Sequence, residues 1–274
     1  MPKPIEFAKR AIRQAKGLKG RGHVPNEVDF RDILWGGASA ARTGSTGEKY
    51  DTLEPFVPKV TDQGAANTCV ARMLENLVAI SESVNNQSYD PIAANPLYHM
   101  AQLKDGIVGD VGSRIRTAIK VLQKHGCPKA SVIPYSPVNV NKGVRADQLI
   151  GGWNSSGLKY EMIEFDGEKK LAAIDNALEH GHPVGYGMLI DKRFMDYTGS
   201  KVITLPAEDA AFIGGHALTL VGPRNSAGVY RGLNTYGRSW GDHGFFNISQ
   251  EYIARMARDV TVMYGWKRAT VRAI

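Results

Sequence analysis

The sequence predicts an α+β fold with two lobes that meet at a cleft. Apolar residues recur at helical spacing through the first half of the chain, and they alternate as in strands after Leu158. Helices that precede strands in this way are typical of α+β proteins, whereas α/β proteins alternate the two. The 274 residues, of which 43% are hydrophobic and 22% charged, suit one globular domain or a two-lobed one.

Three helices are predicted in the first half. The first begins at Cys69. Its buried face consists of Val70, Met73, Leu74, Leu77 and Val84. The second helix begins near Asn95, and the third runs from Ser113 to a C-cap at Gly126. Cys69 therefore lies in the first turn of a helix, where the positive end of the helix dipole favours a thiolate and lowers the pKa of the thiol.

Strands dominate the predicted second half. Their ranges are 158–162, 183–190, 216–222, 229–234 and 245–248. One helix, around Leu171 to Leu178, interrupts them, and another follows Ser249. In the first half, residues 36–47 are rich in Gly, Ala, Ser and Thr, which predicts a flexible surface insertion.

The positive charge of the chain is concentrated at its N-terminus. The net charge is +7, and residues 1–23 contain seven Lys or Arg residues and one Glu, which leaves 27 basic and 26 acidic residues elsewhere. The body of the protein therefore offers no general attraction for nucleic acid. The basic segment is predicted to be a solvated extension, or else an amphipathic arm that docks on an acidic partner or a larger assembly.

The cysteine count and the hydropathy pattern indicate a reducing compartment. Two cysteines cannot build a disulfide framework, and no apolar stretch approaches the roughly 20 residues that span a bilayer. The N-terminus lacks the apolar core of a secretory signal. We therefore expect a cytoplasmic or assembly-associated protein without a transmembrane segment.

Several enzyme classes are excluded because their motifs are absent from the sequence. It has no Gly-x-Ser-x-Gly elbow, no His-Glu-x-x-His, no phosphate-binding loop and no dinucleotide-binding glycine pattern. A lone cysteine at a helix start is more often a small buried apolar residue than a nucleophile. A nucleophilic Cys69 would need a base, a group that orients the base, and donors for an oxyanion.

Four blocks of sequence supply such groups in a recognisable order. They comprise residues 24–31, 57–69, 214–217 and 234–248. These blocks resemble, in turn, the mature N-terminus, the segment leading to the active-site cysteine, the histidine block and the asparagine block of the papain family of cysteine peptidases. The resemblance extends from about residue 24 to about residue 266 and implies the two-lobed papain-like fold. It implies a basic extension over residues 1–23 and a peptidase domain over 24–274, with a helical lobe about 57–157 and a β lobe about 158–266.

The resemblance also implies a catalytic mechanism. Cys69 would be the thiolate nucleophile and His216 the imidazolium that pairs with it, while Asn234 would orient the ring. Gln63 would donate to the oxyanion, together with the backbone N–H of Cys69. Such an endopeptidase hydrolyses a polypeptide substrate through a thioester acyl-enzyme, and the mechanism requires no metal and no organic cofactor.

Two further expectations concern the substrate preference of the site and the packing around it. The resemblance places Ile133, Gly187 and Gly214 around the main specificity pocket, and their apolar or small side chains predict an apolar substrate side chain there. Val70 and Tyr236 stand where the family commonly has tryptophan, so the packing beside the histidine is expected to differ.

Two other functions are open at this point. Only about 23 residues precede the mature-like start, so we do not expect a conventional self-inhibited zymogen. Because an uncontrolled peptidase would harm its producer, the fold could instead serve as a structural or interaction component of a larger assembly, such as a virion or a secretion machine. A further alternative is other amide chemistry, such as cleavage of cell-wall peptides or of a protein conjugate.

Overall fold

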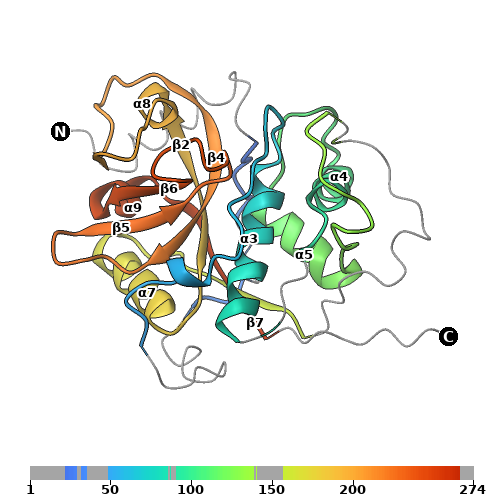
Figure 1. Ribbon diagram of the computed structural model, residues 1–274, viewed down its shortest axis with the longest axis horizontal. Coiled ribbons are helices and arrows are strands. Elements are labelled where there is room, and N and C mark those ends of the chain that lie inside the picture. Colours follow the sequence, from blue (N-terminus) through green and yellow to red (C-terminus); the bar gives the residue numbers. More distant parts are fainter. Residues whose placement is uncertain are drawn as a thin grey trace.

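The helices of the first half of the chain and the sheet of the second half occupy opposite sides of the molecule, as the sequence predicts. The computed structural model describes residues 22–29, 32–35, 49–85, 87, 91–138, 140 and 157–265. Figure 1 shows α3, α4 and α5 gathered on one side and the sheet with α7, α8 and α9 on the other. The predicted insertion at residues 36–47 and most of the basic segment, residues 1–21, lie outside the described residues.

The helical lobe contains the three predicted helices. They are α3 (Cys69–Val84), α4 (Ala94–Asp105) and α5 (Ile115–His125), and the single-turn η1 (Glu54–Phe56) precedes them. The starts of α3 and α4 agree with the sequence to within one residue. The start of α5 was predicted two residues too early because the backbone of Ser113 is extended and pairs with His23 instead.

The second lobe is built on a seven-stranded sheet. Its strands are β1 (Lys159–Met162), β2 (Val184–Asp191), β3 (Val202–Ile203), β4 (Phe212–Gly222), β5 (Val229–Leu233), β6 (Phe245–Ser249) and β7 (Arg258–Tyr264). The order is β1-β7-β2-β4-β5-β6-β3, and every neighbouring pair is antiparallel except β3 with β6. The predicted helices correspond to α7 (Gly167–Glu179) and α9 (Gln250–Met256), whereas β3, β7 and the short α8 (Lys192–Met195) were not predicted.

Helix α3 joins the two lobes. Its buried face contributes Met73 and Leu77 to the helical-lobe core, which also contains Ala217 of β4. Gly185 of β2 lies directly under this helix, and a Cβ at that position would come within 3.0 Å of Met73 and of Leu77. The absence of a side chain at Gly185 therefore allows α3 to pack closely on the sheet.

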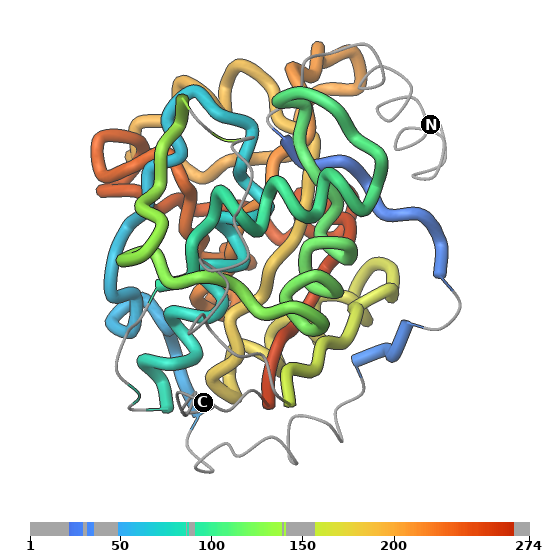
Figure 2. The backbone as a smooth tube through the Cα atoms, turned by 90° about the vertical axis from the view of Figure 1, so that its right-hand side faces the viewer, coloured from blue at the N-terminus to red at the C-terminus, as the bar shows by residue number. Residues whose placement is uncertain are grey.

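The chain near the N-terminus crosses between the lobes. His23 forms a parallel bridge with Ser113 beside α5, and Leu34 forms another with Met162 of β1. In Figure 2 this segment appears in blue, and it runs past the green helices before it reaches the sheet. Residues 22–29 and 32–35 thus contact both lobes, although the sequence predicted a separate extension that ends at residue 23.

The close packing of α3 on β2 predicts a cost for adding one methyl group at Gly185. Gly185→Ala forces its Cβ against Met73, so we expect a loss of about 1–3 kcal/mol of unfolding free energy, measured by urea denaturation. Gly222→Ala is the control, because its nearest neighbour would be 3.3 Å away. Equal stability of the two variants would show that α3 can shift to make room.

Candidate active site

Cys69 is the first residue of α3, and the loop before it is fixed from outside. The carboxylate of Asp110 accepts a hydrogen bond from the backbone N–H of Asn67 at 3.0 Å, and the Asn67 side-chain amide donates to the Asp110 carbonyl at 2.6 Å. The hydroxyl of Thr68, the N-cap residue, bonds to that of Tyr135 at 2.7 Å. These contacts hold the N-terminal turn of the helix in one position.

His216 lies on β4, opposite the start of α3. Its strand neighbour is Met188 of β2, and both Cys69 and His216 are fully buried. The backbone N–H of Ala217, the next residue in β4, donates a hydrogen bond to the sulfur of Cys69. The contact between α3 and β4 therefore brings the sulfur of Cys69 to the segment that carries the imidazole.

Asn234 follows β5 and orients the imidazole ring. Its Oδ1 lies 2.8 Å from Nε2 of His216 and accepts a second hydrogen bond, at 2.7 Å, from the backbone N–H of Thr235. A backbone N–H can only donate, so the atom that it meets on Asn234 must be the oxygen. Nε2 of His216 must then carry a proton, and Nδ1 is the basic nitrogen of the neutral ring.

Gln63 is hydrogen-bonded to Thr235, the residue that follows Asn234. Its backbone N–H donates to the Thr235 carbonyl at 2.8 Å, and its side-chain oxygen accepts from the Thr235 hydroxyl at 2.5 Å. The side-chain nitrogen donates to the carbonyl of Ala66 at 2.6 Å, which turns the amide toward the loop before Cys69. Contacts through Thr235 and the 63–69 loop thus connect all four predicted catalytic residues.

Aromatic rings pack around the imidazole. Tyr236 stacks on His216 with a centroid distance of 4.7 Å and an interplanar angle of 26°, and Phe194 meets the ring edge-on at 5.8 Å. Trp240 packs behind them, against Tyr236 and Phe194. Tyrosine at position 236 therefore still provides an aromatic wall, and Trp240 supports this wall from behind.

The electrostatic state of Cys69 differs from the expectation. Burial raises the pKa of the thiol to about 12, although hydrogen bonds from the backbone N–H groups of Ala217, Val70 and Cys69 act in the opposite direction. A helix N-terminus lowers the pKa only when its effect exceeds the cost of removing the charge from water. The thiol is therefore protonated at neutral pH in this conformation, contrary to the thiolate predicted from its position.

The segment formed by residues 22–24, here called the cleft segment, lies against this site. The backbone N–H of His23 donates to the carbonyl of Gly215, the residue before His216, at 3.2 Å. On the helical lobe, the Ser113 N–H donates to the Gly22 carbonyl at 2.8 Å and the Val24 N–H donates to the Ser113 carbonyl at 3.0 Å. Gly22 also packs so closely on Asn67 that a Cβ would overlap its carbonyl.

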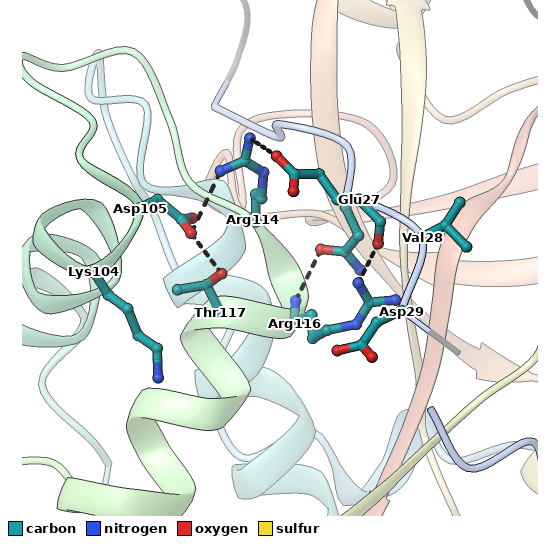
Figure 3. Close-up of a pocket in the computed structure, with 9 residues that line it drawn as sticks. Glu27, Val28, Asp29, Lys104, Asp105, Arg114, Arg116 and Thr117 are labelled. Carbon is teal, nitrogen blue, oxygen red and sulfur yellow. Dashed lines mark hydrogen bonds and ion pairs between the residues drawn. The ribbon is translucent and has the colours of Figure 1, made fainter. Parts of the chain in front are cut away.

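Charged contacts anchor the chain that follows the cleft segment. Arg116 donates to the Glu27 carbonyl and pairs with Asp32, while Arg114 pairs with the Glu27 carboxylate at 3.3 Å. Figure 3 shows the contacts of Arg114 and Arg116 with Glu27 around a pocket of about 650 Å³ between the N-terminal chain and α4 and α5. Its lining contains none of the predicted catalytic residues, so this pocket is not the active site.

The predicted substrate-binding residues separate into two groups. Gly187 and Gly214 lie on the neighbouring strands β2 and β4, and Gly187 faces the ring of His23. Ile133 lies on the loop after α5, where it packs against the helical-lobe core. Its backbone N–H donates a hydrogen bond to the backbone carbonyl of Lys129. The register pairs Gly187 with Ala217 and Gly214 with Ile190, so the two glycines lie on adjacent strands but are not paired with each other, and Ile133 lies on a separate loop.

Sequence reasoning missed Ser113, Gly215 and Asp259. The first two contribute only backbone groups to the contacts with the cleft segment, and Asp259 belongs to no recognisable motif. Within the described ranges, no three His, Cys, Asp or Glu side chains cluster as metal ligands would. No helix in that part of the chain has both the length and the apolar character needed to span a bilayer.

The two-lobed fold, with a helix-terminal cysteine beside a strand histidine that an asparagine orients, is that of a papain-like cysteine peptidase. The sequence model described as papain family cysteine protease matches residues 48–264, and the chain belongs to this family. The chain is 28% identical over 217 residues to an uncharacterized peptidase C1-like protein of Acanthamoeba polyphaga mimivirus, covering 75% of this chain and 68% of that protein. The protein is accordingly a cysteine peptidase that acts on polypeptides.

Solved structures have the same fold. Xylellain, a cysteine protease from Xylella fastidiosa, superposes with a TM-score of 0.74 at 23% identity, over 90% of this chain and 97% of that one. A procathepsin B from Trypanosoma congolense superposes with a TM-score of 0.69 at 16% identity, over 98% and 99% of the two chains. The two-lobed α+β prediction is confirmed.

The hydrogen bond between Asn234 and His216 predicts a specific kinetic defect. Asn234→Ala frees the ring to rotate, so we expect kcat to fall roughly 10- to 100-fold, the usual effect of losing a partner that orients a reacting imidazole, with KM little changed. Steady-state hydrolysis of a fluorogenic peptide measures both constants.

Asn85→Ala is the control for this variant, because that side chain bonds to the Ser81 carbonyl at the far end of α3. A rise in KM with unchanged kcat in Asn234→Ala would contradict the orienting role.

Proposed function

We propose that the protein is a cysteine endopeptidase in which Cys69, His216, Asn234 and Gln63 perform the chemistry. The single observation that carries this proposal is the hydrogen bond from His216 to Asn234, on the strand segment whose Ala217 N–H contacts the Cys69 sulfur. This arrangement gives a thiol a base of defined tautomer. A buried histidine with only a structural role would not need this arrangement.

The proposed reaction has two stages. Nδ1 of His216 takes the proton of Cys69, and the thiolate attacks a peptide carbonyl while Gln63 and the Cys69 N–H donate to the oxyanion. His216 then gives its proton to the leaving amine, and the C–N bond breaks to leave a thioester. Water, deprotonated by His216, hydrolyses the thioester and restores the thiol.

The cleft segment blocks this reaction in the present conformation. It uses the carbonyl of Gly215 and both backbone groups of Ser113, which an incoming peptide strand would otherwise pair with. It also packs against the backbone of Asn67, two residues before Cys69. Substrate binding therefore requires residues 22–24 to leave the cleft, and the protein is latent until they do.

A structural role is the second candidate. The full burial of Cys69 and its raised pKa favour this alternative, because a fold that never uncovers the sulfur could serve only as a scaffold. The two candidates differ in whether displacement of the cleft segment releases a reactive thiol. Both are therefore tested on a variant in which the segment cannot dock.

The rate at which Cys69 is alkylated reports whether the cleft segment covers its sulfur. Because burial raises the pKa of Cys69 to about 12, the thiol of the covered state is protonated near neutral pH, and the rate of its reaction with iodoacetamide should still be rising between pH 7 and 10. Gly22→Ala should accelerate the reaction at pH 7 at least tenfold, since a Cβ at this position overlaps Asn67.

Two controls accompany the alkylation experiment. Gly106→Ala has the same left-handed backbone in open space and should react as the wild type does. Cys69→Ser isolates Cys127, a second buried thiol with a pKa raised to about 12 by burial. If Gly22→Ala is alkylated at the wild-type rate, the cleft segment does not cover the sulfur.

Peptide hydrolysis distinguishes the peptidase from the scaffold. Gly22→Ala should raise the initial rate on a generic fluorogenic peptide several-fold, and adding Cys69→Ser should remove at least 99% of that rate, since a hydroxyl is far less nucleophilic than a thiolate. A Gly22→Ala protein whose thiol reacts rapidly but which cleaves no peptide would support the scaffold instead.

A further inference from the structure

We propose that Arg72 is a positioning residue for the oxyanion donor Gln63. Its guanidinium acts through Asp62 and Tyr135, which hold the loop formed by residues 62–68, here called the donor loop. This loop carries the oxyanion donor near its start and ends next to the nucleophile. The inference rests on the proposed peptidase function, because it adds a residue to the same oxyanion site.

Arg72 and Glu75 form a buried ion pair near the start of α3. Nη1 of Arg72 lies 2.5 Å from the Glu75 carboxylate, and only 8% and 5% of the two side chains are exposed. Burial raises the pKa of Glu75, whereas Arg72 and Lys59 act in the opposite direction. Removing two charges from water costs about as much as their attraction returns, so a buried ion pair contributes little to stability. The other contacts of the guanidinium show what the pair does instead.

These contacts lie on the donor loop and beside it. Nη2 of Arg72 donates to the carbonyl of Asp62, the residue before Gln63, at 3.1 Å. The guanidinium also lies over the ring of Tyr135, with Cζ 4.1 Å from the ring centroid. A guanidinium presents its donors as a rigid planar fork, so the bond to Glu75 fixes the direction of Nη2. One side chain therefore meets both the backbone of the donor loop and the aromatic ring beside it.

Tyr135 connects Arg72 to both ends of the donor loop. Its hydroxyl lies 2.7 Å from the carbonyl of Gln63 and 2.7 Å from the hydroxyl of Thr68. A carbonyl can only accept, so the single hydrogen of the phenol goes to Gln63, and Thr68 donates to Tyr135. Burial raises the pKa of Tyr135, so the phenol keeps this hydrogen at neutral pH. The ring in contact with Arg72 thus ties the oxyanion donor to the residue before Cys69.

The bonds within the donor loop leave the Gln63 amide one hydrogen for an oxyanion. Its nitrogen donates to the Ala66 carbonyl at 2.6 Å, and its oxygen accepts from the Thr235 hydroxyl at 2.5 Å. An amide nitrogen has two hydrogens, so the second is directed by these two bonds. A donor lowers the barrier only if it is already aimed at the place where charge develops. A small shift of the donor loop therefore slows acylation and has little effect on substrate binding.

The test removes the ion pair without leaving a buried charge. In the Gly22→Ala protein, Arg72→Met with Glu75→Leu replaces both groups by apolar side chains of similar size, so the protein should remain folded. We expect kcat/KM on a fluorogenic peptide to fall about tenfold or more through kcat, with KM within about twofold. The matched control is Arg255→Met with Glu251→Leu, which removes an exposed ion pair of α9.

An aldehyde inhibitor separates loss of positioning from loss of structure. A peptide aldehyde forms an S–C bond with Cys69, its carbonyl oxygen becomes a tetrahedral oxyanion, and the thiol proton passes to His216. The inhibition constant should rise by the same factor as kcat/KM falls. Alkylation by iodoacetamide displaces iodide and forms no oxyanion, so its rate should stay within about twofold. A general loss of structure would instead change both reactions.

A double-mutant cycle with Gln63→Ala gives a second readout. If Arg72 acts through Gln63, the ion-pair substitution should change kcat/KM by less than about twofold once that donor is gone. If the ion-pair variant does not fold, Tyr135→Phe carries the same test, because it keeps the ring and removes only the hydroxyl. Full additivity with Gln63→Ala would overturn the positioning role.

The aldehyde also separates failure of this inference from failure of the proposed function. If no peptide is cleaved, but the ion-pair variant alone binds the aldehyde more weakly, the proposed function is wrong and Arg72 still positions Gln63. If peptides are cleaved, and the ion-pair variant retains the kcat/KM and the aldehyde affinity of its control, Arg72 has no positioning role.

Discussion

The packing of the first turn of α3 against β4 is the constraint on which the site depends. It brings the sulfur of Cys69 to the N–H of Ala217, one residue from the catalytic imidazole. Close packing of this kind requires small residues beneath the helix, and Gly185 provides one. The hydrogen bonds of Asn234 and Gln63 then refine the geometry of side chains whose backbones are already in place.

Burial and charge oppose each other at the sulfur. Three backbone N–H groups favour the thiolate, yet complete burial outweighs them and raises the pKa of Cys69 to about 12. The same side chain needs a protected location to react selectively and access to solvent or substrate to ionise. In the proposed function, a cleft that is covered and uncovered would meet both requirements, because the sulfur would be unreactive while residues 22–24 are docked.

The sequence offered candidate site residues more readily than it indicated their surroundings. Cys69 at a helix start, with His216 and Asn234 in strand-rich blocks, could be identified because each lies in a local pattern that resembles the papain family. The start of α5 was placed too early because Ser113 forms a long-range bridge with His23. Such a bridge leaves no signal in the sequence near residue 113.

Strand β7 was not predicted from the sequence, so the residues that it brings beside β2 could not be used to predict substrate preference. It begins with Arg258 and Asp259, whose charges hide the apolar run that follows, so no strand was expected there. Without β7 beside β2, Asp259 could not be placed next to Gly187.

Two separate sets of contacts hold the cleft segment, and they have different consequences. Arg114 and Arg116 contact Pro25, Glu27 and Asp32 outside the cleft. Because this anchor is joined to His23 by a short stretch of chain, it keeps His23 near the cleft at a high effective concentration, in about the millimolar range. His23 and Asp259 form the contact inside the cleft. A substrate must compete only with the inner contact, because the anchor need not break for residues 22–24 to leave. Substitution of the arginines would therefore weaken the anchor without altering the contact between His23 and Asp259.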